Sequence, residues 1–375
     1  MFTILPCITT SERRLFERLP EILQKKDPHY VPPFPGSTVK ILDPKSAFHR
    51  KHGRIYPFLA WRDGKPCGRI AAIINRSHNA HYKDRTGFFG FFDAENDTEL
   101  ANVLFAQVEE ILRKEGCDSI RGPYHPSIHD ECGLLTAGFD TPPMIFMPHN
   151  AAYYEALVLG VGFSQWHELY AFVCDLAQGV PDRIEKVTSR LGRIPGLRIR
   201  DMDLKNMDSE IALICRLYNL TLDANKGYYP IALEDLQEAA EGLKAFADPR
   251  LITFAEIEGE PVAFSMALPN LNEYLLKAKP RTGIFRFLEV VWKIKTRHPL
   301  ANRLAVLGVL PGHRDKGLGA LLYSECLRRG FAGGYRQTEV SWIDKDNRDI
   351  LRAIHAMHCR QTKTYRIYEK RLADG

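Results

Sequence analysis

Two short hairpins are visible in the alternation of apolar and polar positions. Residues 59–72 and 254–267 each contain two short apolar runs, separated by an acidic residue and a glycine. Asp-Gly or Glu-Gly between apolar runs is typical of a tight hairpin turn. Four positions of the two segments also carry the same residue: Ala60 and Ala255, Gly64 and Gly259, Pro66 and Pro261, Ala72 and Ala267. The pattern therefore predicts two related hairpins.

A strand, a loop and an amphipathic helix are predicted after each hairpin. The strands are expected at 86–92 and 303–309, and the helices at 99–114 and 318–331. The first helix has apolar residues at helical spacing, which places them on one face. An ungapped alignment pairs Gly90 with Gly308, Leu104 with Leu322 and Gly116 with Gly334, and a third block pairs Asn150 with Asn347.

Repeated blocks in the same order predict two copies of one fold. The length of 375 residues fits two domains of ordinary size. Prolines at 179–181 and 194–196 indicate a linker between the copies. We therefore expect one domain at 1–178 and a second at 196–375.

Composition narrows the class of protein. Apolar residues make up 45% and charged residues 26%, the balance of a soluble globular protein, and the sequence has no apolar run long enough to span a membrane. The first residues do not resemble a secretory signal, so a cytoplasmic protein is expected. The net charge of +5 is compatible with binding of an anionic cofactor or an anionic membrane face. It is too small to indicate binding to nucleic acid.

The cysteines are scattered singly along the chain. None forms a Cys-x-x-Cys pair, so we expect reduced thiols and no zinc site. The eight residues are Cys7, Cys67, Cys117, Cys132, Cys174, Cys215, Cys326 and Cys359.

The most informative stretch is the glycine-rich, basic loop between the second predicted strand and its helix. The strand ends at Val309, and the helix is expected to begin near Gly317. Such a loop directs backbone N–H groups and the positive end of the helix dipole at one point. Glycine lets a phosphate approach the backbone closely, and the positive charge comes from His313, Arg314 and Lys316. The pattern predicts a pyrophosphate site. The alternative is a glycine-rich turn that only opens a surface helix.

Two common pyrophosphate motifs do not fit this loop. Gly312 and Gly317 have the spacing of a P-loop, but Leu318 and Gly319 follow where Lys and Ser or Thr are needed. The dinucleotide fingerprint needs a third glycine, and Leu322 stands there instead.

The arrangement Arg314-x-x-Gly317-x-Gly319 after a strand resembles the acyl-CoA signature of the GNAT N-acetyltransferase superfamily. The resemblance implies an α/β (α+β) chain of two tandem GNAT-like folds, each a mixed, mostly antiparallel sheet flanked by helices. It implies acyl-CoA, acetyl or longer, as co-substrate and no metal. The expected cofactor-binding residues are Leu307, Gly308, Val309, His313, Arg314, Lys316, Gly317, Leu318, Gly319, Ala320 and Asn347.

The first copy lacks this signature. Asn96, Glu99 and Ala101 align with the arginine and the two glycines, and the loop at 93–99 is strongly acidic. Carboxylates repel a pyrophosphate. We therefore expect the first copy to be degenerate and only the second to bind acyl-CoA.

Short segments along nearly the whole chain resemble a group of bacterial tandem GNAT proteins that includes bacterial ceramide synthases. These segments are 27–33, 87–92, 130–135, 138–143, 269–273 and 363–370. The resemblance implies transfer of an acyl group from coenzyme A to a primary amine, including a lipid amine of the sphingoid type. The alternatives are a small-molecule or peptide N-acetyltransferase that uses acetyl-CoA, and a non-catalytic acyl-CoA sensor.

The catalytic groups are less clearly marked. The family often uses a tyrosine on the helix after Asn347 to protonate the thiolate, but this helix has none, which leaves Tyr323, Tyr365 and Tyr368 as candidate acids, the first two preferred. The resemblance also places the backbone N–H that polarises the thioester at 308–310. Glu273 and Glu339 are candidate bases, although each could be a surface carboxylate.

Residues 125–132 crowd His, Asp, Glu and Cys together but lack the spacing of a metal site. We expect this segment to line an acceptor groove instead. The expected groove residues are Glu131, from this segment, and Asn272.

Residues 277–297 predict a basic amphipathic helix. Lysines and arginines flank an apolar stripe, and such a helix can lie on an anionic membrane or cover a lipid-sized pocket. The alternative is packing against the other copy. The stripe consists of Ile284, Phe285, Leu288, Val291 and Trp292.

Overall fold

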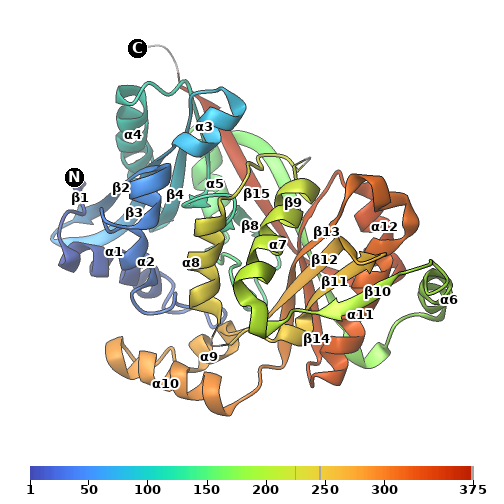
Figure 1. The fold of residues 1–375 in the computed structure, drawn as a ribbon. Helices are drawn as coiled ribbons and strands as arrows, with labels where there is room; N and C mark the ends of the chain where they lie inside the picture. The colour runs from blue at the N-terminus through green and yellow to red at the C-terminus, as the bar shows by residue number, and fades with distance from the viewer. Residues whose placement is uncertain (224, 245, 373–375) are drawn as a thin grey trace. The chain divides into compact units, whose positions relative to one another are not determined.

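The computed structural model describes residues 1–223, 225–244 and 246–372, and it divides into two compact units (Figure 1). The first unit combines Met1–Glu168 with Asn272–Lys293 and the C-terminal segment that begins at Thr364. The second unit combines Leu169–Leu271 with Ile294–Lys363. Each unit therefore contains segments distant in sequence. The predicted copies, 1–178 and 196–375, were each defined as one continuous segment of the chain, and these boundaries stay a prediction.

The first unit contains a mixed, mostly antiparallel sheet. Its strand order is β1-β2-β3-β4-β5-β15, with β8 also paired to β15, and β4 and β5 are parallel. The strands are β1 (Thr3–Pro6), β2 (Gly53–Arg62), β3 (Lys65–Asn75), β4 (Thr86–Ala94), β5 (Ser119–Gly122), β8 (Leu134–Ala137) and β15 (Arg360–Arg371), besides a small ribbon of β6 (Tyr124–His125) and β7 (Glu131–Cys132). The helices are α1 (Thr10–Leu23), α2 (Ser37–Ile41), a π-helix (Phe48–His52), α3 (Arg76–Tyr82), α4 (Thr98–Lys114), α5 (Tyr154–Gly160), α9 (Asn272–Lys277) and most of α10 (Gly283–Thr296).

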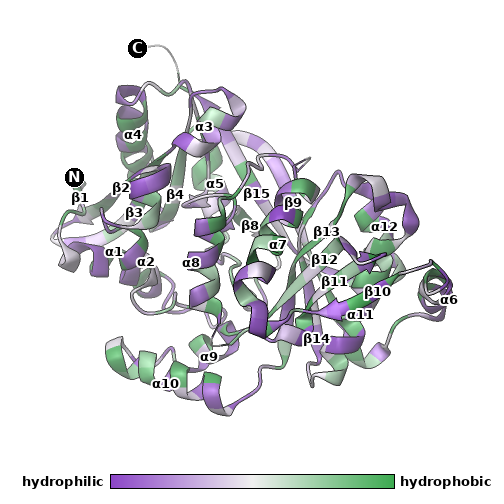
Figure 2. Cartoon of the chain, in the orientation of Figure 1, coloured by the Kyte–Doolittle hydropathy of each residue, from purple (hydrophilic) through white to green (hydrophobic). Residues whose placement is uncertain are grey.

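The core of the first unit lies mainly between the sheet and α4. This helix carries hydrophobic and hydrophilic residues (Figure 2), and its hydrophobic residues Leu100, Leu104 and Val108 are fully buried. They pack with Phe89 and other strand residues in one apolar cluster. The helical apolar spacing in the sequence is confirmed as the buried face of α4.

The second unit repeats the same element order. Its strands run β9-β14-β13-β12-β11-β10 across the sheet, and only β13 and β14 are parallel. The strands are β9 (Ser164–Asp175), β10 (Arg198–Asp201), β11 (Ile252–Ile257), β12 (Glu260–Pro269), β13 (Ala301–Val309) and β14 (Gln337–Asp344). The helices are α6 (Asp182–Leu191), α7 (Met207–Thr221), α8 (Leu233–Leu243), α11 (Leu318–Ala332) and α12 (Arg348–Ala356), with 3-10 turns at Leu176–Gln178, Leu204–Asn206, Pro249–Leu251 and Pro311–Lys316.

Both predicted hairpins are confirmed. In β2–β3 the turn residues Asp63 and Gly64 have φ of 52° and 73°, and in β11–β12 Glu258 and Gly259 have φ of 54° and 87°. Two consecutive positive φ angles define the turn that matches the twist of paired strands. The acidic residue and glycine at the same place in both units follow from this requirement.

The repeat alignment is right for the helices and wrong for the strands before them. Leu104 and Leu322 are both fully buried on their helices. In the strands, however, Ala72 faces Phe89, whereas Ala267, which aligns with Ala72, faces Leu304. Gly90 is therefore not equivalent to Gly308. The ungapped alignment failed because the loop between strand and helix is longer in the second unit.

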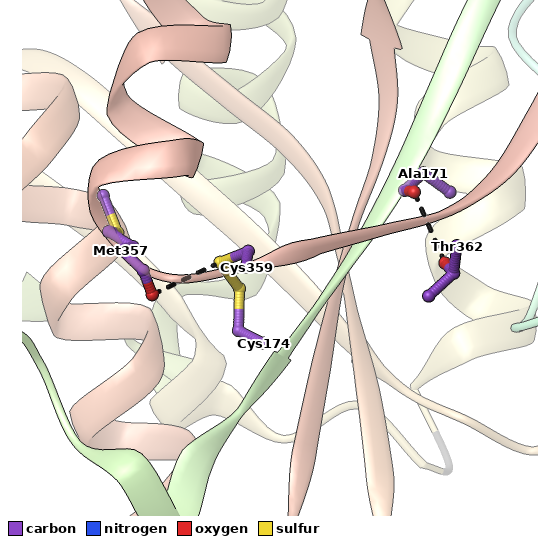
Figure 3. Close-up of a disulfide and its surroundings, with 5 residues drawn as sticks. All are labelled: Ala171, Cys174, Met357, Cys359 and Thr362. Carbon is purple, nitrogen blue, oxygen red and sulfur yellow. Dashed lines mark hydrogen bonds between the residues drawn. A yellow bond between two sulfur atoms is a disulfide. The ribbon is translucent and has the colours of Figure 1, made fainter.

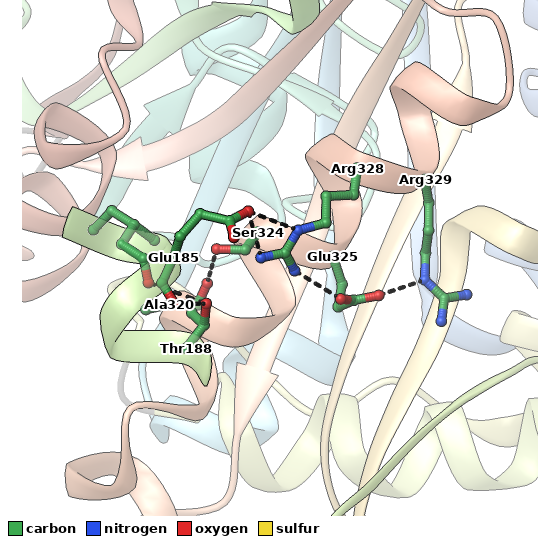
Figure 4. Close-up of polar contacts among 8 residues, drawn as sticks. Glu185, Thr188, Ala320, Ser324, Glu325, Arg328 and Arg329 are labelled. Atoms are coloured by element: carbon green, nitrogen blue, oxygen red, sulfur yellow. Dashed lines mark hydrogen bonds and ion pairs between the residues drawn. The ribbon is translucent and has the colours of Figure 1, made fainter. Parts of the chain in front are cut away.

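The predicted linker contains α6, which packs on α11 within the second unit (Figure 4). The buried side chains of α6 are Ile184 and Thr188. At the rim, Arg328 Nη2 lies 3.0 Å from Glu185 Oε1. Exposed ion pairs contribute little to stability, so the buried apolar contacts dominate. Helix α6 therefore supports the helix that carries the predicted acyl-CoA loop.

One expectation about cysteine is wrong. Cys174 and Cys359 form a disulfide within the second unit, with Cα atoms 4.3 Å apart (Figure 3). The two residues are separated by 185 positions in the sequence, so their proximity depends on strand pairing that spacing does not reveal. The other six cysteines are free thiols.

Candidate active site

The predicted acyl-CoA loop forms the N-terminus of α11. After β13, a 3-10 turn (Pro311–Lys316) leads to Gly317, which has φ of 75°. This left-handed conformation favours glycine. The first helical hydrogen bond runs from Leu321 N to Gly317 O, at 3.2 Å. The backbone N–H groups of the first turn of α11, which precede Leu321, have no acceptor within the helix, and the helix dipole adds positive potential there.

The space in front of this turn is open. A side chain at Gly312 would meet nothing within 4 Å, and one at Gly319 would meet only Leu307 Cδ2, at 4.0 Å. Arg314 and Lys316 are exposed beside the turn. Lys316 Nζ lies 3.2 Å from His313 Nδ1, and the Arg314 guanidinium donates to the carbonyls of Val309 and Thr221, at 3.4 and 3.2 Å. Open N–H groups flanked by cations fit a pyrophosphate.

Several predicted cofactor residues also have a structural role. A side-chain carbon at Gly308 would lie 2.1 Å from Thr221 Oγ1, so this glycine permits α7 to approach β13. Leu318 is fully buried, and Leu307 and Val309 pack against the same apolar cluster. The side chain of Asn347 caps α12 by accepting a hydrogen bond from Ile350 N, at 3.2 Å. Ala320 lies in the first turn of α11, where its backbone is the relevant group.

The central parallel strands of the second unit diverge beside this loop. Their pairing runs from Ala301 and Gln337 to Leu304 and Val340, while β13 continues to Val309 and β14 to Asp344. The register of β13 against β12 shifts between Val306 and Leu304, which is a bulge at Ala305. A bulge re-aims backbone groups, and this one lies where the pairing of β13 with β14 ends.

Glu339 lies at the base of this divergence. It faces Arg303 across the two strands and is 1% exposed. Ser341 Oγ donates to Glu339 Oε1 at 2.8 Å, and Arg303 Nε donates to Ser341 Oγ at 2.9 Å. Arg303 also stacks on the Trp342 ring, with its guanidinium carbon 4.8 Å from the ring centre. The candidate base is therefore held in a buried polar network.

The pKa of Glu339 is raised above the ordinary glutamate value. The main cause is burial, which disfavours the charged carboxylate, and this is partly offset by the charge of Arg303, the hydrogen bond from Ser341 and the charge of Lys363. A raised pKa brings a carboxylate closer to the value that suits a general base near neutral pH. The sequence indicated Glu339 but not Arg303, Ser341 or Lys363. A buried arginine or lysine in a β-strand is the signal that could have identified two of them.

The two preferred candidate acids are both buried tyrosines. Tyr323, on α11, is 4% exposed among apolar side chains of the second unit, and burial raises the pKa of its hydroxyl. Tyr365 is fully buried in the first unit, where its backbone pairs with Leu135 of β8.

The remaining candidates belong to the first unit. Glu273 and Asn272 begin α9, and the Asn272 amide donates to the carbonyls of Pro143 and Met144, at 3.1 and 2.9 Å. Glu131 lies on β7, with its Oε2 3.7 Å from His125 Nδ1. Within the residues that the structure describes, no group of three or more His, Cys, Asp or Glu side chains could hold a metal ion.

The first unit satisfies the corresponding helix N-terminus with its own carboxylate. Asp97 caps α4 by accepting a hydrogen bond from Leu100 N, at 3.1 Å. Arg62 pairs with both Asp97 and Glu95. A carboxylate therefore caps the N-terminus of α4, whereas the glycine at the N-cap of α11 has no side chain to do so, and Arg62 at the end of β2 is already paired.

The end of β4 is also closed by side chains. Tyr153 donates from its hydroxyl to Ala94 O at 2.7 Å, and Ala94 N donates to the Tyr154 hydroxyl at 3.3 Å. In strand register Ala94 corresponds to Val309, at the end of β13. The backbone groups that an extended ligand could pair with are thus occupied in the first unit.

Comparisons with known proteins agree with this geometry. The acetyltransferase (GNAT) family model matches residues 214–357, which include the loop, the divergent strands and Glu339. The bacterial ceramide synthase of Caulobacter vibrioides is 30% identical over 99% of this chain and 97% of its own length. The chain belongs to the GNAT family. This GNAT chain is also 27% identical to protein YghO of Escherichia coli, over 97% of the chain and 94% of the relative.

Solved structures support the tandem arrangement of this GNAT protein. A tandem GNAT protein from the clavulanic acid biosynthesis pathway matches all of both chains with a TM-score of 0.60 and 12% identity. A GCN5-related N-acetyltransferase from Sphaerobacter thermophilus matches with a TM-score of 0.56 and 14% identity, over 100% of this chain and 96% of its own. The predicted fold class, two tandem GNAT-like folds with mixed sheets, is confirmed. As a member of this family, the chain is an N-acyltransferase.

Proposed function

We propose that this chain transfers an acyl group from acyl-CoA to a primary amine, with acyl-CoA bound only by the second unit. The observation that carries the proposal is the position of the open, glycine-capped N-terminus of α11 beside the divergence of β13 and β14, with Glu339 at its base. This arrangement provides a place for a pyrophosphate, an unpaired strand edge for the extended part of the ligand, and a base.

Each part of the site has a separate task in this proposal. The first-turn N–H groups of α11, with Arg314 and Lys316, hold the pyrophosphate. Backbone N–H groups near the bulge at Ala305 polarise the thioester carbonyl. This position differs from the predicted 308–310, because the bulge precedes Gly308.

Glu339 accepts the proton of the attacking amine. The nitrogen lone pair forms the new C–N bond to the carbonyl carbon, the C–S bond breaks, and the departing thiolate takes a proton. Tyr323 and Tyr365 remain the candidate donors of that proton, and Glu273 remains the second candidate base.

We further propose that the acceptor is a lipid amine of the sphingoid type. The support is the ceramide synthase from Caulobacter vibrioides, which matches this chain from end to end. Glu131 and Asn272 are the proposed acceptor-groove residues.

Release of free thiol tests this function. Purified protein is supplied with acetyl-CoA or a long-chain acyl-CoA, together with a sphingoid base, a short alkylamine or a peptide. We expect release that requires an amine and is fastest with the long-chain donor and the sphingoid base. Faster release with acetyl-CoA and a small amine would favour an acetyltransferase. Acyl-CoA binding without release from any amine would indicate a non-catalytic sensor.

A further inference from the structure

Helix α10 packs with a charged residue turned inward. Arg286 is 6% exposed, and its Nη1 and Nη2 lie 3.0 and 2.5 Å from the two carboxylate oxygens of Glu21 on α1. Its guanidinium also donates to the carbonyls of Arg281 and Lys279. Val290, one turn further along, is fully buried. These residues define the face of α10 that contacts the rest of the first unit.

The opposite face is apolar and exposed. Ile284, Phe285, Leu288 and Trp292 are 61%, 68%, 55% and 54% exposed. Leu288 lies four residues after Ile284, three after Phe285 and four before Trp292, a spacing that places the four side chains along one side of the helix. Hydrophobic residues are accordingly prominent on α10 in Figure 2. A contiguous apolar patch of this kind indicates an interaction surface.

The segment around this stripe is mainly cationic. Residues 277–297 contain a single acidic residue, Glu289. It pairs with Arg281 and Lys293 and so leaves the segment cationic. The basic residues of the segment are Lys277, Lys279, Arg281, Arg286, Lys293, Lys295 and Arg297. Lys277, Lys295 and Arg297 are exposed.

We propose that the outer face of α10 docks on an anionic lipid bilayer. Its apolar stripe would enter the boundary between headgroups and acyl chains, and the flanking cations would contact anionic headgroups. A second copy of this chain is a poorer occupant, because a symmetric contact places the same cationic flank against itself. The inference deepens the proposed function, since a lipid amine would be presented at that surface, but bilayer binding itself needs no turnover.

Vesicle sedimentation with the full chain tests this proposal. We expect the protein to sediment with phosphatidylglycerol-containing vesicles at low salt, to be released at high salt, and to ignore purely zwitterionic vesicles. Replacing both Phe285 and Trp292 by Ser should weaken binding about tenfold or more, because large apolar groups leave the bilayer. Lys295→Glu should weaken vesicle binding at low salt.

The matched control is Ile8→Ser, since Ile8 is 70% exposed in the same unit but lies outside α10. This variant should bind vesicles like the wild type. All variants should melt like the wild type, because the replaced side chains are exposed. The Lys295→Glu result remains decisive if the double variant fails to fold.

Equal vesicle binding by the wild type and both α10 variants, or no binding by the wild type at low salt, would overturn the proposal. A concentration-dependent dimer in sedimentation velocity that the double variant loses would assign the surface to a second copy instead. Retained thiol release with a short amine after loss of vesicle binding would support the proposal. Intact vesicle binding without any turnover would contradict the proposed function alone.

Discussion

Replacing Glu339 by glutamine is expected to lower kcat by about 10²–10⁴-fold, the range for loss of a general base. Glutamine keeps the shape of the side chain and can still accept the Ser341 hydrogen bond, but it cannot take the proton of the amine. The affinity for acyl-CoA should stay near that of the wild type, because the loop on α11 is unchanged. Steady-state kinetics and calorimetry together measure both effects.

The matched control is Glu210→Gln, a similarly buried carboxylate of the second unit that pairs with Arg200, 2.8 Å away. It should retain near-normal kcat. Full activity of Glu339→Gln, or an equal loss in the control, would exclude Glu339 as the base. A loss confined to Glu273→Gln would assign the role to that residue.

The pH profile gives a second measure of Glu339. Its pKa is raised in the folded protein, so kcat/KM should fall as the pH decreases through a value above the ordinary range for glutamate, about 4.3. The contribution of Glu339 to the stability of the fold depends on pH in the opposite direction. A group with a raised folded-state pKa contributes stability that is present below the unfolded pKa and lost as the pH rises through the folded pKa. The melting temperature of the wild type relative to Glu339→Gln should therefore decrease over that rise.

A carboxylate at Gly317 is expected to weaken acyl-CoA binding about a hundredfold, which is close to 3 kcal/mol. The left-handed backbone at this position is tolerated by Asp and by Asn, so the fold should survive either change. Asp places a negative charge where we propose that the phosphates bind, just as Asp97 places one at the N-terminus of α4. Calorimetric titration with a non-reactive acyl-CoA analogue measures the loss.

Gly317→Asn is the matched control, because it adds a side chain of nearly the same size without charge. It should lose much less affinity than Gly317→Asp. Wild-type affinity in the Asp variant would place the pyrophosphate elsewhere. Equal losses in both variants would mean that the side chain blocks the site sterically and that charge is unimportant.

Features of the fold that depend on neighbouring residues were predictable from the sequence. The turns at Asp63-Gly64 and Glu258-Gly259 and the buried face of α4 follow from local spacing. The disulfide and the strand register depend on which distant segments pair. The direction that α10 faces was also not predictable, because its apolar stripe resembles an ordinary core face until Arg286 is seen to be buried against Glu21.

The same division applies to the site. The proposed acyl-CoA loop is one continuous segment, so its glycines and cations could be selected as candidates from the sequence alone. The environment of Glu339 is not local, since Arg303 and Lys363 come from other strands and alter its pKa only after folding. The acidic loop predicted that the first copy does not bind acyl-CoA, but the capping by Asp97 and the hydroxyl contacts of Tyr153 and Tyr154 could not be predicted from it.

The number of acyl-CoA molecules bound per chain tests the central claim most directly. Calorimetric titration of the full chain with a non-reactive acyl-CoA analogue should give one site. That site should remain in Asp97→Ala, which opens the N-terminus of α4, and should bind about a hundredfold more weakly in Gly317→Asp. Two sites per wild-type chain, or one site that survives Gly317→Asp at full affinity, would contradict the account.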